Sequence, residues 1–294
     1  MDKLSTAMQA FVDAEGLGHT DGLTDTKLQG VSFYHSRHSS ARRPLLYQSG
    51  IIIMGQGHKS IHLSEHNVKY SAGDYLVIGV PLPLECEAIA DDGKPLLSLC
   101  IDVDLPLLRT LVKELNINKL KPIDKPKNNC GLQLCKLDNT IEDSCIRLLN
   151  CLLDETDMRV LGKDIVKEII YRVLNGPQAD TLIGLVQQES HYAKIAQVLD
   201  AVHANVANPI TVESLSQEAN MSVSSFHRAF KEVTMESPIQ YIKKLRLAKA
   251  KDLIQLEGKR SSDAANLVGY SSKSQFFREF KRRYNHSPSQ VIFD

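Results

Sequence analysis

The chain of 294 residues lacks the features that mark membrane, secreted and zinc-binding proteins. It has no signal peptide and no apolar run of the roughly eighteen residues that a membrane span needs. These absences favour a cytoplasmic protein without a membrane partner. Its six cysteines are not spaced as zinc ligands. In a reducing compartment we expect free, mostly buried thiols, with a redox switch as the alternative.

The chain also lacks net charge, but its two parts carry opposite charges. It holds 35 basic and 35 acidic residues. Residues 190–294 contain 15 Lys and Arg against 10 Asp and Glu, a net of +5, whereas residues 1–189 contain 20 against 25, a net of −5. A basic segment beside an acidic one favours a nucleic-acid partner for the C-terminal part, although a solvated charged surface would give the same count.

A nineteen-residue segment occurs twice in this basic part, fifty positions apart. Residues 222–240 read SVSSFHRAFKEVTMESPIQ, and residues 272–290 read SKSQFFREFKRRYNHSPSQ. Each copy predicts a short helix with two Phe on one face and an Arg and a Lys on another, followed by Ser-Pro-x-Gln. The nine identical pairs are Ser222/Ser272, Ser224/Ser274, Phe226/Phe276, Arg228/Arg278, Phe230/Phe280, Lys231/Lys281, Ser237/Ser287, Pro238/Pro288 and Gln240/Gln290.

The residues before each copy predict a helix-turn-helix. Asn220 and Gly269 lie where its tight turn needs the left-handed backbone region. Ser222 and Ser272 follow as N-caps, and Gln275 predicts a capping box for the second. The second turn has one extra residue, Ser271.

A long helix is predicted between the two units. Ile242, Leu245 and Leu253 recur near helical spacing between Pro238 and about Leu256. At ~1.5 Å per residue this segment spans about 27 Å. Such a helix can place two recognition helices in successive major grooves, which are ~34 Å apart.

Residues 190–294 resemble the DNA-binding domain of the AraC/XylS family of bacterial transcription regulators. The resemblance rests on the two helix-turn-helix units, their separation and the repeated Ser-Pro. It departs at Ser261 and Ala264, where the family usually has larger aliphatic residues. The resemblance implies double-stranded DNA as the partner, with RNA polymerase as a second one.

The helix faces opposite the paired Phe residues are the predicted DNA-binding surfaces. An Arg side chain can donate two hydrogen bonds to one guanine, at O6 and N7, whereas Gln prefers adenine. An exposed Phe can contact the thymine methyl group. We expect Lys231 and Lys281, near the helix ends, to contact phosphates. Surface ion pairs are the alternative for Arg228 and Arg278. The full set is Ser224, Ser225, His227, Arg228 and Lys231 in the first unit, and Lys273, Ser274, Gln275, Phe277, Arg278 and Lys281 in the second.

The first part predicts an antiparallel β structure. Short apolar runs at 31–34, 50–54, 60–63, 75–80 and 96–103 are separated by turn sequences, as in a sandwich or barrel. The segment from Gln56 to Pro83 resembles the cupin-like sensor domain of one branch of the same family. In well-known members this barrel binds a sugar or an aromatic effector, so the resemblance implies a possible small-molecule effector.

The fold class that we predict is α+β. A cupin-like antiparallel β-barrel with flanking helices forms a sensor and dimerisation domain over residues 1–178. An all-α domain of two helix-turn-helix units joined by a long helix covers residues 190–294. Residues 176–190 are the expected linker, with part of it ordered.

Helical segments flank the predicted barrel. A helix opens at Asp104 and runs to about Leu115, and another stripe spans Val160 to Val173. Between them an apolar stripe begins near Asp138. In the resembled family such helices pack across a homodimer axis, whereas burial against the chain's own barrel is the alternative. The predicted dimerisation residues are Ile141, Cys145, Leu148, Leu149 and Leu152.

Five histidines of the first part raise the question of a metal site, since neutral imidazole is a common ligand. Their order lacks the His-x-His and following Glu of metal-binding cupins, so we expect no metal and no cofactor. They are His35, His38, His58, His62 and His66.

The predicted function is therefore a DNA-binding transcription regulator, an activator and a homodimer, that is not an enzyme. The alternative is a cupin-type metal-dependent enzyme or metal sensor with a DNA-binding appendage. It would need a metal triad, or a nucleophile with a positioned base, and the sequence shows neither.

Overall fold

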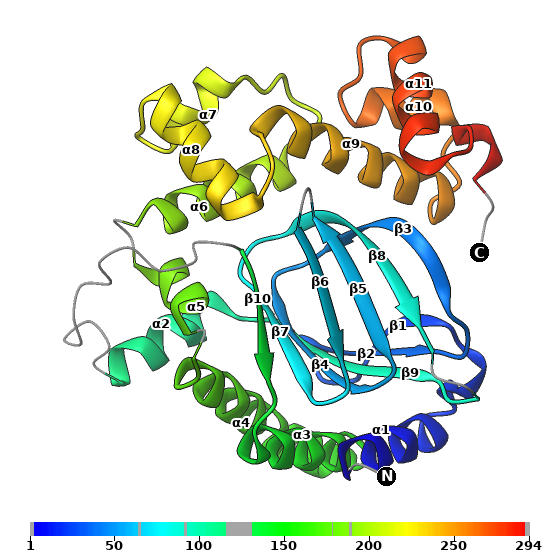
Figure 1. The fold of residues 1–294 in the computed structure, drawn as a ribbon, viewed down its shortest axis with the longest axis vertical. Helices are drawn as coiled ribbons and strands as arrows, with labels where there is room; N and C mark the ends of the chain where they lie inside the picture. The colour runs from blue at the N-terminus through cyan, green and yellow to red at the C-terminus, as the bar shows by residue number, and fades with distance from the viewer. Residues whose placement is uncertain are drawn as a thin grey trace.

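The computed structural model describes residues 3–63, 66–90, 93–115, 131–177, 179–187 and 190–291. Its N-terminal part holds two antiparallel sheets (Figure 1). The first sheet has the strand order β1 (Gly22–Asp25), β2 (Val31–Ser36), β9 (Leu96–Ile101), β4 (Gly50–Gln56), β7 (Asp74–Ile78), β10 (Leu132–Lys136). The second has the order β3 (Ser40–Tyr47), β8 (Leu82–Ile89), β5 (His58–Leu63), β6 (His66–Ser71).

Gly57 lets the chain pass from one sheet to the other. It joins β4 of the first sheet to β5 of the second with a φ of 76°, a region that favours glycine. A Cβ there would lie 3.0 Å from the Ile89 carbonyl oxygen. The α+β class is confirmed, but the predicted barrel is not closed. Among the described strands, β1, β10, β3 and β6 end the two sheets and keep an unpaired edge.

Helices cover the outer face of the first sheet. They pack on its alternate side chains, such as Phe33, Ile53 and Leu99, each fully buried. The Asp104 carboxylate accepts from the Leu107 N–H at the start of α2, as an N-cap does. These helices are α1 (Lys3–Ala14), α2 (Leu105–Glu114), α3 (Asn139–Leu152) and α4 (Glu155–Leu174).

The C-terminal part is all helical, as predicted. It lies across the end of the sheets away from α3 and α4 (Figure 1). Its elements are α6 (His191–Ala204), α7 (Val212–Glu218), α8 (Val223–Thr234), α9 (Pro238–Gln255), α10 (Ser261–Leu267), α11 (Lys273–Tyr284) and a short 3-10 turn, η3 (Pro288–Gln290). Another 3-10 turn, η1 (Leu17–His19), follows α1.

The expected linker contains a helix, α5 (Ala179–Val186). Its Leu182 and Ile183 are buried in the core beside the first sheet, with 0% and 5% exposure. The part of this segment that the structure describes is thus packed against the N-terminal core. No described helix is long and apolar enough to cross a membrane.

Candidate nucleic-acid interface

The first helix-turn-helix consists of α7 and α8. Asn220 takes the left-handed conformation in the turn, with a φ of 52°, and the Ser222 hydroxyl accepts a hydrogen bond from the Ser225 N–H at 3.3 Å. Phe226 and Phe230 are fully buried, with ring centroids 5.5 Å apart. The predicted turn, cap and core face are therefore confirmed, and the opposite face of α8 remains outside.

The second unit, α10 and α11, repeats this construction with smaller core residues. Gly269 has a φ of 86°, and a Cβ there would lie 2.5 Å from the Ala207 carbonyl oxygen. Ala264 and Val268 are fully buried. The small side chain of Ala264 thus lies in a closely packed core, whereas Ser261 is half-buried at the start of α10.

One detail of the second cap differs from the prediction. The Ser272 hydroxyl accepts from the Gln275 N–H at 3.3 Å. The Gln275 side chain, however, donates to the Glu279 carboxylate at 3.3 Å instead of returning to the cap, so we find only the Ser272 half of the predicted capping box.

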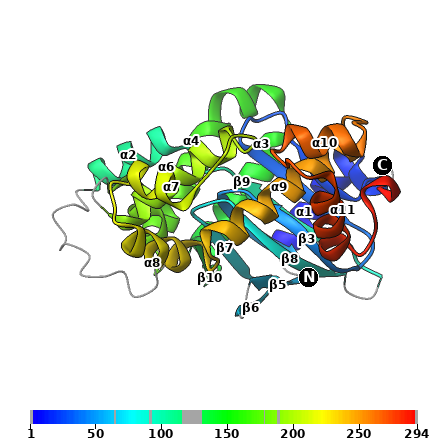
Figure 2. The same ribbon diagram turned by 90° about the horizontal axis from the view of Figure 1, so that it is seen from above.

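The predicted DNA-binding side chains lie on one face of each recognition helix. In α8, Ser224, His227, Arg228 and Lys231 are exposed and Ser225 is half-buried. In α11 all six are exposed: Lys273, Ser274, Gln275, Phe277, Arg278 and Lys281. Figures 1 and 2 show α8 and α11 at opposite ends of α9.

The ion-pair alternative for the two arginines lacks support. Among the residues that the structure describes, neither Arg228 nor Arg278 forms a hydrogen bond or an ion pair, whereas Arg147, Arg172 and Arg42 each bind a carboxylate. Both guanidinium groups therefore present their donors to solvent, which suits a bidentate contact with a base or a phosphate.

A polar cluster that the repeat did not predict fixes the second unit on α9. The Lys243 ammonium lies 3.1 Å from the Glu279 carboxylate, and the Tyr270 hydroxyl donates to it at 2.9 Å. Burial alone would raise the pKa of Glu279, but the bonds from Tyr270, Lys243 and Gln275 lower it. Glu279 thus stays ionised and ties α11 to α9.

Arg246 of α9 also holds the units together. Its guanidinium donates to the carbonyl oxygens of Val206 at 3.1 Å and Asn208 at 2.8 Å. These carbonyls lie on the loop before α7. The sequence carried no signal for this contact, because the acceptors are backbone atoms about forty residues away.

The first unit also contacts the N-terminal part directly. The Gly131 N–H donates to the Val233 carbonyl oxygen of α8 at 2.8 Å. Tyr241, on α9, donates its hydroxyl proton to the Pro81 carbonyl oxygen at 2.6 Å and lies 2.9 Å from Nε2 of His203. Burial lowers the pKa of His203 to about 4. His203 is therefore neutral at physiological pH, and its Nε2–H donates to Tyr241.

The burial of the predicted dimerisation stripe within one chain favours the alternative that it packs inside the protomer. The five side chains are 0% to 4% exposed within one chain, where α3 packs on α1 and α4. Side chains already buried have no surface left for a partner, so the alternative of burial in the protomer holds. The residues are Ile141, Cys145, Leu148, Leu149 and Leu152.

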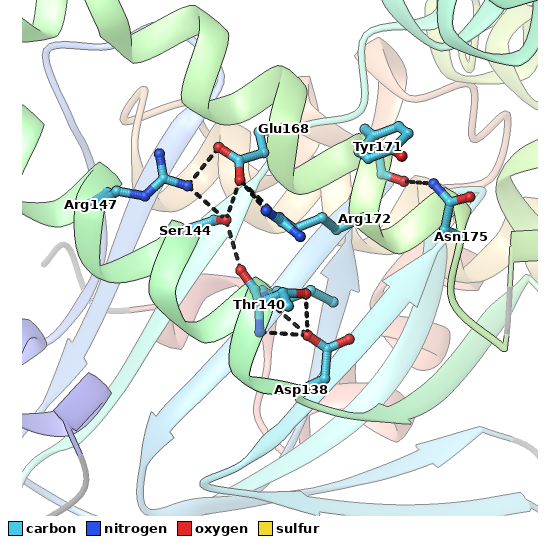
Figure 3. Close-up of polar contacts among 9 residues, drawn as sticks. Asp138, Thr140, Ser144, Arg147, Glu168, Tyr171, Arg172 and Asn175 are labelled. Atoms are coloured by element: carbon cyan, nitrogen blue, oxygen red, sulfur yellow. Dashed lines mark hydrogen bonds and ion pairs between the residues drawn. The ribbon is translucent and has the colours of Figure 1, made fainter. Parts of the chain in front are cut away.

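Polar contacts reinforce the packing of α3 on α4 (Figure 3). The Glu168 carboxylate accepts from Arg147 at 2.6 Å, from Arg172 at 2.6 Å and from the Ser144 hydroxyl at 3.1 Å. The hydrogen bond from Arg147 is the largest contribution that lowers the pKa of Glu168, to about 2.

The histidines do not come together. Nδ1 of His35 lies 2.6 Å from the Thr20 carbonyl oxygen, and Nδ1 of His62 lies 2.7 Å from the Asn67 side chain. The His66 side chain lies outside the described residues. Across 3–63, 67–90 and the other described ranges, we find no cluster of three or more potential metal ligands.

Five of the six cysteines lie in the described part, as free thiols. Cys86, Cys135, Cys145 and Cys151 are buried, and Cys100 is half-buried. Burial raises the pKa of Cys145 to about 12 and that of Cys100 to about 11. These two thiols stay protonated near neutral pH. Cys130 lies outside the described residues.

Curated relatives match about a third of the chain. AlkR of Acinetobacter baylyi, an HTH-type transcriptional regulator, is 36% identical over 97 residues, which are 33% of this chain and 32% of AlkR. RhaS of Citrobacter koseri, an HTH-type transcriptional activator, is 27% identical over 99 residues, 34% of this chain and 36% of RhaS. The match thus spans about a third of the length of these relatives.

A solved structure and two family descriptions extend the likeness to most of the chain. ToxT of Vibrio cholerae superposes with a TM-score of 0.57 over 88% of this chain and 96% of ToxT, at 12% identity, so the two share a fold. Residues 215–292 match a helix-turn-helix domain. Residues 27–181, more than half of the chain, match the AraC-type transcriptional regulator N-terminus. The chain belongs to the family of AraC-type transcriptional regulators.

Proposed function

We propose that this protein is a sequence-specific DNA-binding transcription regulator. The observation that carries the proposal is the tandem pair of recognition helices, each with an exposed arginine that has no partner among the described residues. Arg228 and Arg278 read bases in successive major grooves, and Lys231 and Lys281 contact phosphates. We further propose that it is an activator, as the name of the transcriptional activator RhaS supports. An activator of this kind would contact RNA polymerase and act in the cytoplasm, where its DNA lies.

Footprinting on the DNA beside its own gene tests this function. We expect protection of two major grooves about one helical turn apart, on one face of the duplex. Protection should vanish when the site is replaced by a scrambled sequence of the same length and base composition. Equal affinity for both sequences would contradict sequence-specific recognition.

We propose that the N-terminal part binds an effector and does not catalyse a reaction. The pKa of its Cys100 and Cys145 thiols is raised by burial, and a protonated thiol is a poor nucleophile. ToxT, with the same fold, has been solved with a small organic acid bound. An effector can regulate only if it binds the active and inactive arrangements with different affinities.

We also propose a homodimer, through the outer face of α4 instead of the buried stripe. Leu153, Val160 and Leu161 are 43%, 63% and 46% exposed, although large apolar side chains are normally buried. Leu153 ends α3, and the other two follow on the first turns of α4. A second copy of the same face would remove them from water.

A further inference from the structure

One of the predicted base-reading side chains is held by a buried carboxylate. Gln275 is exposed in the first turn of α11, the part of a recognition helix that contacts base edges. Its amide nitrogen donates to the Glu279 carboxylate at 3.3 Å, one helical turn further along the chain. Glu279 is only 7% exposed. The Gln275 side chain is thus tied to a point inside the second helix-turn-helix.

Other elements fix this carboxylate in place. Oε1 of Glu279, the atom that accepts from Gln275, lies 3.1 Å from the Lys243 ammonium of α9. Oε2 accepts from the Tyr270 hydroxyl at 2.9 Å, and Tyr270 is itself buried. A buried charge is costly unless it is paired and hydrogen-bonded. These donors keep Glu279 where it is, so the carboxylate holds Gln275 and does not follow its movements.

The bond also decides which end of the Gln275 amide faces inward. A carboxylate only accepts hydrogen bonds, so it binds the amide nitrogen and repels the amide oxygen. A half-turn of the amide would exchange the two atoms and place oxygen against oxygen. The amide oxygen and the second N–H of Gln275 are left for a base. Adenine presents one acceptor, N7, and one donor, the N6 amino group, in the major groove.

The space beside the cluster gives Gln275 an alternative position. A cavity of about 450 Å³ lies between α7, α9 and α11, and Lys243, Tyr270 and Gln275 are among its lining residues. Without a partner, the Gln275 side chain could turn toward this cavity and away from a base. The bond to Glu279 opposes that movement. A side chain that is fixed before binding loses less conformational entropy when it binds.

The first unit lacks this arrangement. Fifty positions earlier, the repeat has Ser225 in place of Gln275 and Ala229 in place of Glu279. Ala229 is buried, and its methyl group cannot accept a hydrogen bond. The same helical repeat therefore folds with Ala at this position. The carboxylate adds a constraint that exists in the second unit and not in the first.

We propose that Glu279 is a specificity-determining positioning residue, which holds the Gln275 amide so that the second unit prefers adenine at one base pair. Because Glu279 is buried, it acts through Gln275 and does not itself contact DNA. This inference rests on the proposed DNA-binding function and assigns one base preference within it to a pair of residues.

Selection of bound sequences from a pool of random DNA duplexes tests the assignment with the full-length protein. The wild type should prefer adenine at one position by about fivefold or more. Gln275→Ala should lose this preference and so identify the base pair. Glu279→Ala should lower the preference at the same base pair by about threefold or more. Its affinity for random DNA should not change, because Glu279 contacts no phosphate.

Two further variants separate positioning from a merely structural role. Tyr270→Phe removes the donor to Oε2 but leaves Oε1, so it should keep the preference of the wild type. The double variant with Ala at 275 and 279 should match Gln275→Ala, because Glu279 acts through Gln275. A folded Glu279→Ala protein with an unchanged preference at this base pair would overturn the assignment. An equal loss of preference at every position would do the same and leave Glu279 as a structural tie.

Glu279→Gln keeps the test decisive if circular dichroism shows that Glu279→Ala does not fold. It preserves the size of the side chain, but its amide has one acceptor oxygen for three donors. Gln275 thus loses its charged acceptor, and the preference for adenine should fall at the same base pair. A folded Glu279→Gln protein with the preference of the wild type would overturn the assignment.

The same selection separates this inference from the proposed function. If the wild type enriches no sequence, the proposed function as a sequence-specific regulator fails. If Arg278→Ala changes the enriched sequence but Gln275→Ala does not, sequence-specific recognition stands and only the role of Gln275 and Glu279 is overturned.

Discussion

The Gly131 N–H donates to the Val233 carbonyl oxygen at 2.8 Å, and this bond joins the sensor part to the first recognition helix. Val233 lies in the last turn of α8, where carbonyl groups lack partners within the helix. The recognition helix thus completes its hydrogen bonding on the sensor. The N-terminal part therefore restrains the first unit at this point, and a change in the N-terminal part would alter the restraint.

Gly131→Ala should loosen that hold. The new Cβ would lie 2.7 Å from a Val80 methyl carbon and 2.8 Å from the Val233 oxygen, so the two parts must move apart. If docking on the N-terminal part restrains DNA binding, the affinity of this variant for a single half-site should rise. Fluorescence anisotropy measures that affinity, at one fixed salt concentration because phosphate contacts depend on ionic strength. A single half-site also removes the advantage of dimerisation.

The control is Gly18→Ala, where a Cβ meets no atom within 4 Å. It should bind the half-site like the wild type. A lower half-site affinity for Gly131→Ala, with its folding intact, would show that docking on the sensor assists DNA binding instead of restraining it.

Arg228→Ala and Arg278→Ala should each weaken operator binding by ~1 to 3 kcal/mol and relax the preference at one base pair. Lys231→Ala should weaken all sequences alike, since a phosphate contact carries no base information. Binding to the operator and to random DNA measures both effects. Arg159→Ala, on exposed α4, should change neither, and equal losses on both DNAs for the arginine variants would disprove base reading.

Glu168 should make stability depend on pH. Its folded pKa of about 2 lies below the usual 4.5, so its contribution is present above about pH 4.5 and is lost as pH falls toward 2. Glu168→Gln should therefore lower the free energy of unfolding at pH 6 more than at pH 3, measured by urea denaturation. If Glu168→Gln lowered the free energy of unfolding equally at both pH values, the charge of Glu168 would not contribute to its contacts with Arg147 and Arg172.

Leu148→Glu should abolish folding, whereas Leu161→Glu should abolish only dimerisation. Leu148 is fully buried, so an unpaired charge there should unfold the protein. Leu161 is 46% exposed on α4, so its substitution should give a folded monomer if this face forms the dimer. Sedimentation and circular dichroism distinguish the outcomes, with Thr110→Glu, at an exposed position of α2, as control. A folded Leu161→Glu dimer would rule out this face.

The parts of the fold that follow a local rule could be predicted from the sequence. Both helix-turn-helix units could be predicted from three local features: turn residues with positive φ, serine caps and Phe pairs. Each feature depends only on residues that are close in sequence. Five strands with apolar runs were also predicted. The charged edge strand β3 and the polar β6 were not, because one face of each is exposed and neither has an apolar run.

Long-range partners could not be predicted. An apolar stripe such as that of α3 shows that a helix face is buried, but not whether another helix or another chain covers it. Lys59 appeared only as one polar residue in a strand, whereas its ammonium lies 3.4 Å from the centroid of the Tyr34 ring, which comes from the other sheet. Glu279 likewise depends on Lys243 of another helix.

The two recognition helices belong to tandem repeats and share Ser224/Ser274, Arg228/Arg278 and Lys231/Lys281, but they differ at two of the five paired DNA-binding positions, Ser225/Gln275 and His227/Phe277. A two-fold pair of identical helices reads a palindrome, the same from either strand. Tandem, unlike units read two different sequences in a fixed order, so a single chain can bind its site in only one direction. Reversing the site would turn the acidic sensor half toward the other end of the DNA. Activation should therefore depend on the orientation of the site relative to the promoter as much as on its sequence. An inverted site should bind the protein equally well but should not support activation.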